Sequence, residues 1–323
     1  MNQRKHHQQG VALIIVLLIV AIVSVLATEM GGRLQLQIKR ASNIKDNNQA
    51  YWYAMGAEQY ARKSIKQLID ENPDIIHLEQ PWNQEFVYPI EGGGIQAQLV
   101  DMQSCFNLNA LQEPDTSKLE ERKEAFYRLL QQVEPSISSY NIDLLRDSLV
   151  DWLDKDSNPT GIGAEDSEYE SRQFPYIAAN NFMVHKSELR LIHGVEASWL
   201  QELLKLVCVL PNTNTFSINV NTVTEENAAV IVAATKLNLS DAKSLLASRG
   251  PDGFKDVNVF LNDPSIQASN LTAEQKSWFA VKTDHFILHT KTKYNDATFA
   301  MQTLFKVDTN NNVIVIRRDF SGF

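Results

Sequence analysis

The chain has 323 residues, with 39 acidic and 30 basic side chains and a formal net charge of −9. This length allows one large domain or two ordinary ones, and the acidic balance argues against a nucleic-acid partner. The sequence contains no nucleophile elbow, phosphate loop or dinucleotide fingerprint, and its histidines show no metal-ligand spacing with a carboxylate. We therefore expect a non-enzymatic protein.

The N-terminus is a short basic leader that ends in Gly10, followed by an uninterrupted apolar run over residues 11–27. At about 1.5 Å per residue, a helix over this run is just long enough to cross a bilayer. The basic leader predicts a cytoplasmic N-terminus and an outward-facing remainder. Two cleavage sites fit: one after Gly10, which leaves the apolar helix on the mature chain from Val11, and a signal-peptidase site after Ala27. The lone Gly10 and the charge-free run favour the first.

From Thr28 to about Asp70 the helix is expected to continue, because small and apolar residues recur at spacings of three and four. These residues are Ala50, Ala54, Ala57, Ala61, Ile65 and Leu68. The three prolines and three glycines between residues 73 and 94 predict a loop. A strand is expected over Ile95–Asp101.

Three further strands are predicted near the C-terminus, over Phe286–Tyr294, Ala297–Val307 and Val313–Arg318. Residues 308–312 read as the turn of the last hairpin, and residues 110–279 are mostly helical in pattern. This order predicts an α+β fold in which a helical domain interrupts one antiparallel sheet. The predicted parts are a leader (1–10), a membrane helix (11–27), a stem helix with the first strand (28–106), an inserted helical domain (107–279) and C-terminal strands (280–323).

The helical domain contains a candidate calcium loop. Counting from Asp154, oxygen-bearing side chains occupy positions one, three and five (Asp154, Asp156, Asn158), and Glu165 occupies position twelve. An EF-hand loop uses these positions, with a late bidentate Glu that completes six to eight oxygen ligands. Pro159 replaces the glycine of that loop, and a solvated acidic loop is the alternative. We expect calcium ligands at Asp154, Asp156 and Glu165, joined by Asn158, by Asp166 and by the carbonyl of Thr160.

Cys105 and Cys208 have no metal-ligand spacing. In an oxidising compartment they would close a loop of about a hundred residues, worth ~4 kcal/mol in the chain-entropy model. Two buried free thiols are the alternative.

The N-terminal segment resembles type IV pilins and the pilin-like subunits of type II secretion. Most members carry Glu as the fifth mature residue, where this chain has Ile15. The minor pseudopilin K family of type II secretion lacks that Glu. It is also similar over FNLNAL (106–111), DWLDKDSNPTGIGAED (151–166) and SELRLIHGV (187–195).

This resemblance implies a pilin-like fold with a bulky helical insertion that holds calcium. It implies an inner-membrane protein with its globular part in the periplasm, cleaved by prepilin peptidase after Gly10 and methylated at Val11. It also implies a place at the pseudopilus tip with minor pseudopilins I and J, next to the other pseudopilins. There the protein would start or cap the filament that exports folded proteins.

Two other functions remain open from the sequence. One is a membrane-tethered, calcium-dependent binding module that does not depend on prepilin peptidase. The other is a DNA-binding subunit of a competence-type pilus, because residues 228–261 resemble a helix-hairpin-helix unit. The turn of that unit, residues 236–239, has no glycine, and the chain is acidic, so we expect no nucleic-acid partner. An Asn-x-Asn pattern at residues 107–109 recurs at residues 219–221 as a weak internal repeat.

Overall fold

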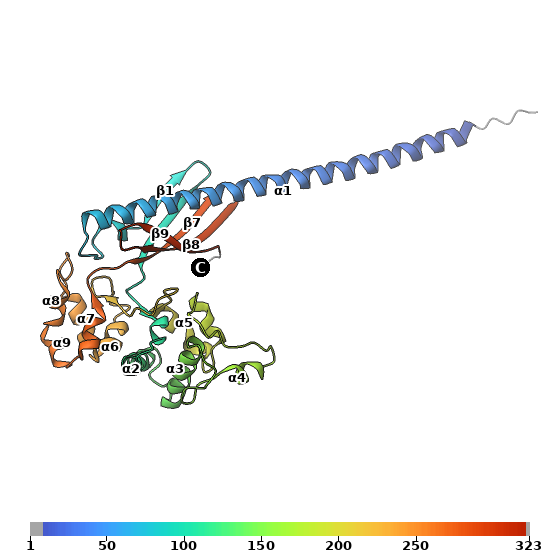
Figure 1. Cartoon of the computed structure of the whole chain (residues 1–323). Helices are drawn as coiled ribbons and strands as arrows, with labels where there is room; N and C mark the ends of the chain where they lie inside the picture. Colours follow the sequence, from blue (N-terminus) through green and yellow to red (C-terminus); the bar gives the residue numbers. More distant parts are fainter. Residues whose placement is uncertain (1–8, 321–323) are drawn as a thin grey trace, which may run out of the picture.

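The computed structural model describes residues 9–320, and side chains from residue 11 onward. Most of the predicted leader, residues 1–8, lies outside the described residues. A single helix, α1 (Gln9–Glu71), runs along one side of the molecule, and its N-terminal part extends beyond the rest of the protein (Figure 1).

The two parts of α1 have different surfaces. Large apolar side chains from Val11 to Leu26 are all at least half exposed, and this part is the one described segment long and apolar enough to cross a membrane. In the C-terminal part, the six small or apolar residues at helical spacing are all buried. The predicted amphipathic helix is thus confirmed, and its alanines allow α1 to lie close against the sheet.

The sheet has five antiparallel strands in the order β1-β2-β7-β8-β9. Their bounds are β1 (Phe86–Ile90), β2 (Gly93–Asp101), β7 (His285–Tyr294), β8 (Ala297–Val307) and β9 (Val313–Asp319). Its core against α1 includes Ile65, Leu99, Phe286 and Phe305, together with Trp82 of the short helix η1 (Pro81–Asn83). The three predicted C-terminal strands are confirmed to within one residue at each end. Asp308 closes the last hairpin, accepting the N–H groups of Asn310 and Asn312 at 2.8 Å.

The prediction of a loop over residues 73–94 was wrong in its last part. Strand β1 pairs with β2 there, and Pro89 lies within it. Proline is tolerated because β1 is an edge strand, so the missing N–H removes no bond from the interior of the sheet. Gly92, with φ of +82°, provides the tight connection.

A helical domain is inserted between β2 and β7, and in Figure 1 it lies on the side of the sheet away from α1. Its longer helices are α2 (Thr116–Val133), α3 (Ser139–Leu153), α5 (Ala197–Leu206), α6 (Ala229–Thr235) and α7 (Leu239–Ala247). Its short helices are η2 (Leu108–Leu111), α4 (Asp166–Glu170), η3 (Lys186–Leu191), α8 (Val257–Leu261), α9 (Pro264–Ala268) and α10 (Ala273–Ser277). A separate apolar core, which includes Phe106, Phe126 and Trp278, holds these helices together.

Two short parallel strand pairs, which the sequence pattern did not predict, close the two halves of the insertion. β3 (Phe106–Asn107) pairs with β4 (Val207–Cys208), and β5 (Ile218–Asn219) pairs with β6 (Phe279–Ala280).

The Asn-x-Asn repeat has the same structural role in both halves. Asn109 accepts the N–H of Met183 at 2.8 Å and donates to the carbonyl of the same residue at 2.9 Å. Asn221 does the same to Phe254, at 2.7 and 3.0 Å. These four hydrogen bonds are buried, so each Asn side chain satisfies a backbone N–H and a backbone carbonyl that would otherwise lack a partner. The insertion is therefore built from two similar units.

Candidate metal centre

The predicted calcium loop begins where α3 ends. Asp154 is the C-cap of α3, Asp156 lies two residues further along, and Glu165 directly precedes α4. The structure brings one carboxylate oxygen from each of these three residues within 4.8 Å of the others. The three side chains that the spacing placed at positions one, three and twelve thus converge on one point.

Glu165 is the least solvated member of the cluster. Its side chain is 3% exposed, and both carboxylate oxygens are buried without a hydrogen-bond partner. Burial, followed by the charge of Asp151 and then that of Asp154, raises the pKa of Glu165 to about 7. Burial and the charge of Asp156 raise the pKa of Asp154 to about 6. A buried carboxylate needs a proton or a cation, and the raised pKa values of Glu165 and Asp154 express this need.

The other predicted ligands are held by hydrogen bonds of the loop. The side-chain amide of Asn158 donates to Asp156 Oδ1 at 2.9 Å. The Thr160 carbonyl accepts the N–H of Gly163 at 2.8 Å. Asp166 Oδ1 accepts the N–H of Ala178 at 2.9 Å, and Asp166 is not part of the group of three. These residues shape the loop around the three clustered carboxylates.

Two carboxylates of α3, Asp147 and Asp151, accept backbone N–H groups of the loop. Neither was among the predicted ligands. Asp151 is fully buried; one oxygen accepts the N–H of Thr160 at 2.8 Å and the other has no partner. Asp147 accepts the N–H of Ile162 at 3.3 Å and pairs with Arg146 at 3.0 Å. Their i,i+4 spacing on one helix face is the sequence signal that identifies them together.

Gly163 is required by this close approach. A Cβ atom there would lie 2.1 Å from Asp151 Oδ2 and 2.8 Å from the backbone carbon of Asp147. The loop can therefore lie directly on α3, which keeps Glu165 away from water.

The chemistry of the cluster fits a hard divalent cation. All three clustered groups are carboxylates, and Ca²⁺ and Mg²⁺ prefer oxygen ligands, whereas zinc sites usually include His or Cys. Ca²⁺ accepts six to eight oxygens in flexible geometry, which suits an irregular loop. Asp154, Asp156 and Glu165 would hold the ion.

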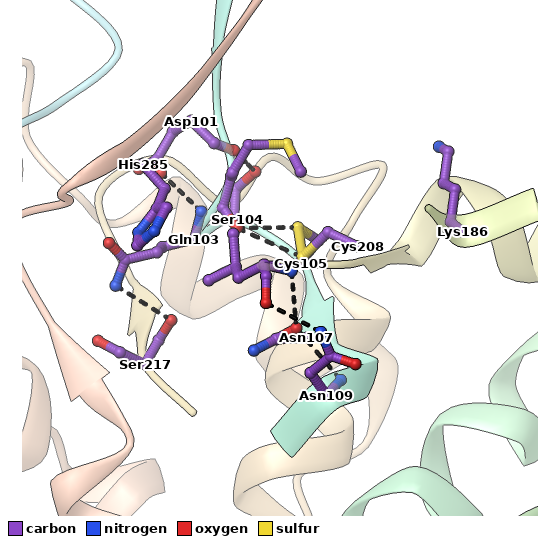
Figure 2. The surroundings of a disulfide bond; sticks show 12 residues. Asp101, Gln103, Ser104, Cys105, Asn107, Asn109, Lys186, Cys208, Ser217 and His285 are labelled. Carbon is purple, nitrogen blue, oxygen red and sulfur yellow. Dashed lines mark hydrogen bonds between the residues drawn. A yellow bond between two sulfur atoms is a disulfide. The ribbon is translucent and has the colours of Figure 1, made fainter. Parts of the chain in front are cut away.

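Cys105 and Cys208 form a disulfide at the junction of the sheet and the insertion (Figure 2). Cys105 directly precedes β3, and Cys208 is the last residue of β4, the strand that pairs with β3. Next to it, buried Asp101 at the end of β2 accepts hydrogen bonds from Thr222 Oγ1 at 2.6 Å and from Asn219 Nδ2 at 3.0 Å. The hydrogen bonds of Asp101 therefore tie the end of β2 to the second unit of the insertion, and the disulfide joins the two ends of the first unit.

Comparison with known proteins identifies the family. The family described as type II secretion system (T2SS), protein K, matches in two segments, residues 104–212 and 218–282. The type II secretion system protein K of Aeromonas hydrophila is 34% identical over 96% of this chain and 96% of its own length. That of Klebsiella pneumoniae is 34% identical over 97% of both chains. The chain belongs to the type II secretion system protein K family.

A solved structure supports the same assignment. A chain in the crystal structure of the GspK-GspI-GspJ complex from the enterotoxigenic Escherichia coli type 2 secretion system matches with a TM-score of 0.79 and 29% identity. The match covers 88% of this chain and all of that chain. The predicted pilin-like fold with a helical insertion is confirmed, and the two matched segments of the protein K family coincide with the two Asn-x-Asn units.

The segment that resembles a helix-hairpin-helix unit is a pair of helices that packs into the core of the insertion. Helices α6 and α7 form the pair, but Lys236, with φ of +65°, occupies the left-handed position between them. Every residue of α6 is buried. The pair is thus part of the protein K core.

Proposed function

We propose that this chain is a non-enzymatic minor pseudopilin that starts or caps the type II secretion pseudopilus together with minor pseudopilins I and J. The observation that carries the proposal is the fold match to a chain of the GspK-GspI-GspJ complex. The filament that grows behind this tip would export folded proteins across the outer membrane.

The N-terminal helix supports a pilin-like route to the membrane. Val11–Leu26 presents apolar side chains all around α1, as a single span of the inner membrane requires. Prepilin peptidase would cut after Gly10 and methylate Val11, leaving this helix on the mature protein. The disulfide agrees with a globular part in the oxidising periplasm.

The size of the inserted helical domain supports a position at the tip of the pseudopilus. The insertion adds a second core to a sheet and helix that already form a pilin-like unit. A subunit that carries such a domain obstructs the addition of another subunit ahead of it, and Ile15 removes the Glu that would neutralise the amine of a preceding subunit.

Calcium would order the loop between α3 and α4, which has little apolar content of its own. The support is the buried, unpartnered carboxylate of Glu165 beside Asp154 and Asp156. Because folding places three negative charges together, the cation contributes to folding stability directly.

Calcium affinity is expected to weaken as the pH falls. The ion binds the deprotonated carboxylates, so protons compete with it below the pKa of Glu165, about 7, and below that of Asp154, about 6. We expect a loss of up to about tenfold per pH unit between pH 7 and 6, and a steeper loss below pH 6. Without calcium, the folding stability depends on pH in the opposite sense and rises as the pH falls. The pKa values of Glu165 and Asp154 are raised in the folded state, so protonation stabilises the folded protein. Calcium titrations by calorimetry from pH 8 to 5 test this, and a constant affinity would contradict it.

The tip assignment is tested with the full chain in detergent. We expect the mature protein to begin at methylated Val11 only in cells with prepilin peptidase, and to retain both minor pseudopilins I and J during purification. Intact-mass measurement and co-purification give the two results. A start at Thr28 or Met1, with neither partner retained by a folded chain, would favour a tethered calcium-binding module instead.

A further inference from the structure

The short helix η3 of the insertion contacts the edge strand β9 of the sheet. The Arg317 guanidinium of β9 donates to the carbonyl of Val184, the residue that directly precedes the N-cap of η3. Lys186 Nζ, in the first turn of η3, donates to the carbonyl of Leu204 in α5 at 2.9 Å. In the strand order β2-β7-β8-β9, this contact lies three strands away from β2. The insertion is thus held to the sheet at β9 as well as at the end of β2.

His185 caps η3 in a form that only a neutral imidazole can adopt. Its Nδ1 accepts the backbone N–H of Ser187 at 3.1 Å and lies 2.8 Å from Ser187 Oγ. A backbone N–H can only donate, so His185 Nδ1 carries no proton. Glu188 completes the cap by accepting the N–H groups of Val184 and His185, at 2.7 and 2.9 Å. A proton on His185 Nδ1 would set two donors against each other and break the cap.

The charges that face His185 oppose its protonation. The cations are Arg317 on β9 and Lys186 on η3. The acids are Asp319 on β9 and Glu188 on η3. Asp319 Oδ2 already accepts a hydrogen bond from Arg317 Nε at 2.9 Å, and the Glu188 carboxylate is occupied by the cap. Burial, followed by the charge of Arg317, lowers the pKa of His185.

Strand β7 places a second histidine next to the same cations. Burial, followed by the charge of Lys186, lowers the pKa of His289. A proton on His185 or on His289 therefore adds a positive charge beside Lys186. Because both pKa values are lowered in the folded protein, the contact is most stable above the ordinary histidine pKa of 6.5. It weakens as the pH falls below that value.

We infer that His185 is a pH-sensitive latch, whose protonation releases η3 from β9 and lets the insertion move relative to the sheet. The end of β2, where Asp101 binds Asn219 and Thr222, keeps the two parts joined. The latch does not depend on the proposed function, because it concerns only how two parts of this chain are held together.

Amide hydrogen exchange of the full chain in detergent, at about pH 7.5 and about pH 5.5, tests the cap. After correction for the intrinsic rate, we expect peptides from residues 186–191 to lose up to about tenfold in protection at the lower pH. Tenfold is the effect of one pH unit below the ordinary histidine pKa. His185→Asn should keep its protection at both pH values, because Asn caps a helix through an amide oxygen that takes up no proton. His193→Asn, at a histidine that pairs with Glu168 on α4, is the matched control and should keep the pH response.

Spin-labelled amino acids at Val259 on α8 and Ile314 on β9, both exposed, measure the movement itself. We expect one narrow distance distribution at about pH 7.5 and a shifted or broadened one at about pH 5.5. The His185→Asn protein should keep the narrow distribution at both pH values.

The calcium loop titrates in the same pH range, so both measurements are made with saturating calcium and with a chelator. The latch should open in both conditions. It would be overturned by a pH response that His185→Asn leaves unchanged, by one that occurs only without calcium, or by a distance distribution that does not depend on pH. Equal loss of protection in peptides from β2 would show general unfolding and would overturn it as well.

Discussion

Replacing Glu165 with Gln is expected to abolish the calcium-dependent stabilisation of the protein. The parent should gain about 2.7 kcal/mol at a calcium concentration one hundred times the dissociation constant, or roughly 5–10 °C in melting temperature for a domain of this size. Glu165 is the most buried member of the cluster, and neither of its oxygens has another partner. The substitution therefore removes the charge and one of the two oxygens of a central ligand without breaking a hydrogen bond.

The same substitution should leave the calcium-free protein at least as stable as the parent. Glutamine carries no charge, so the repulsion from Asp151 and Asp154 that helps to raise the pKa of Glu165 disappears. Thermal unfolding of the full chain in detergent, with calcium and with a chelator, measures both effects. Glu170→Gln changes the charge by the same amount at an exposed position on α4 and should keep the calcium response. A calcium response that survives Glu165→Gln would show that the cluster does not hold the ion.

The parts of the fold that the sequence predicts well are those set by local periodicity. The buried face of α1 repeats every three or four residues, and the β7-β8-β9 strands alternate around turns that contain Asn. The convergence of Asp154, Asp156 and Glu165 was also predictable, because positions one, three and twelve of the predicted loop lie within twelve consecutive residues. In each case the determining contacts lie close together in the chain.

The parts that it misses depend on distant contacts. Strand β1 exists because β2 is available as a partner, and the parallel pairs β3-β4 and β5-β6 join segments that are far apart in sequence. Residues 171–185 have no regular secondary structure, and their course depends on hydrogen bonds to Asp156, Asp166 and Asn109. Strand β9 is fixed in the same way, by an ion pair between residues 58 and 318 that no local signal reveals.

Replacing Arg318 with Met is expected to destabilise the sheet by about 3–5 kcal/mol, the usual cost of removing one partner of a buried ion pair. Glu58 lies on α1 and is completely buried. It accepts hydrogen bonds from Arg318 Nε at 2.6 Å and Nη2 at 2.8 Å, and from Thr303 Oγ1 at 3.0 Å. Without Arg318, the buried carboxylate keeps only neutral partners, Thr303 Oγ1 and, at 3.3 Å, Gln59 Nε2.

The reverse substitution, Glu58→Gln, should cost less, because the Arg318 side chain is 37% exposed and can turn its charge to solvent. The double variant should be more stable than the sum of the two losses predicts, since Gln beside Met leaves no buried charge. Denaturant unfolding with an unchanged slope measures all three free energies. Equal costs for the two single variants, or strict additivity, would show that the pair is not the contact that fixes β9 to α1. The expected asymmetry follows from burial alone: of two paired charges, the one that cannot reach water determines the cost.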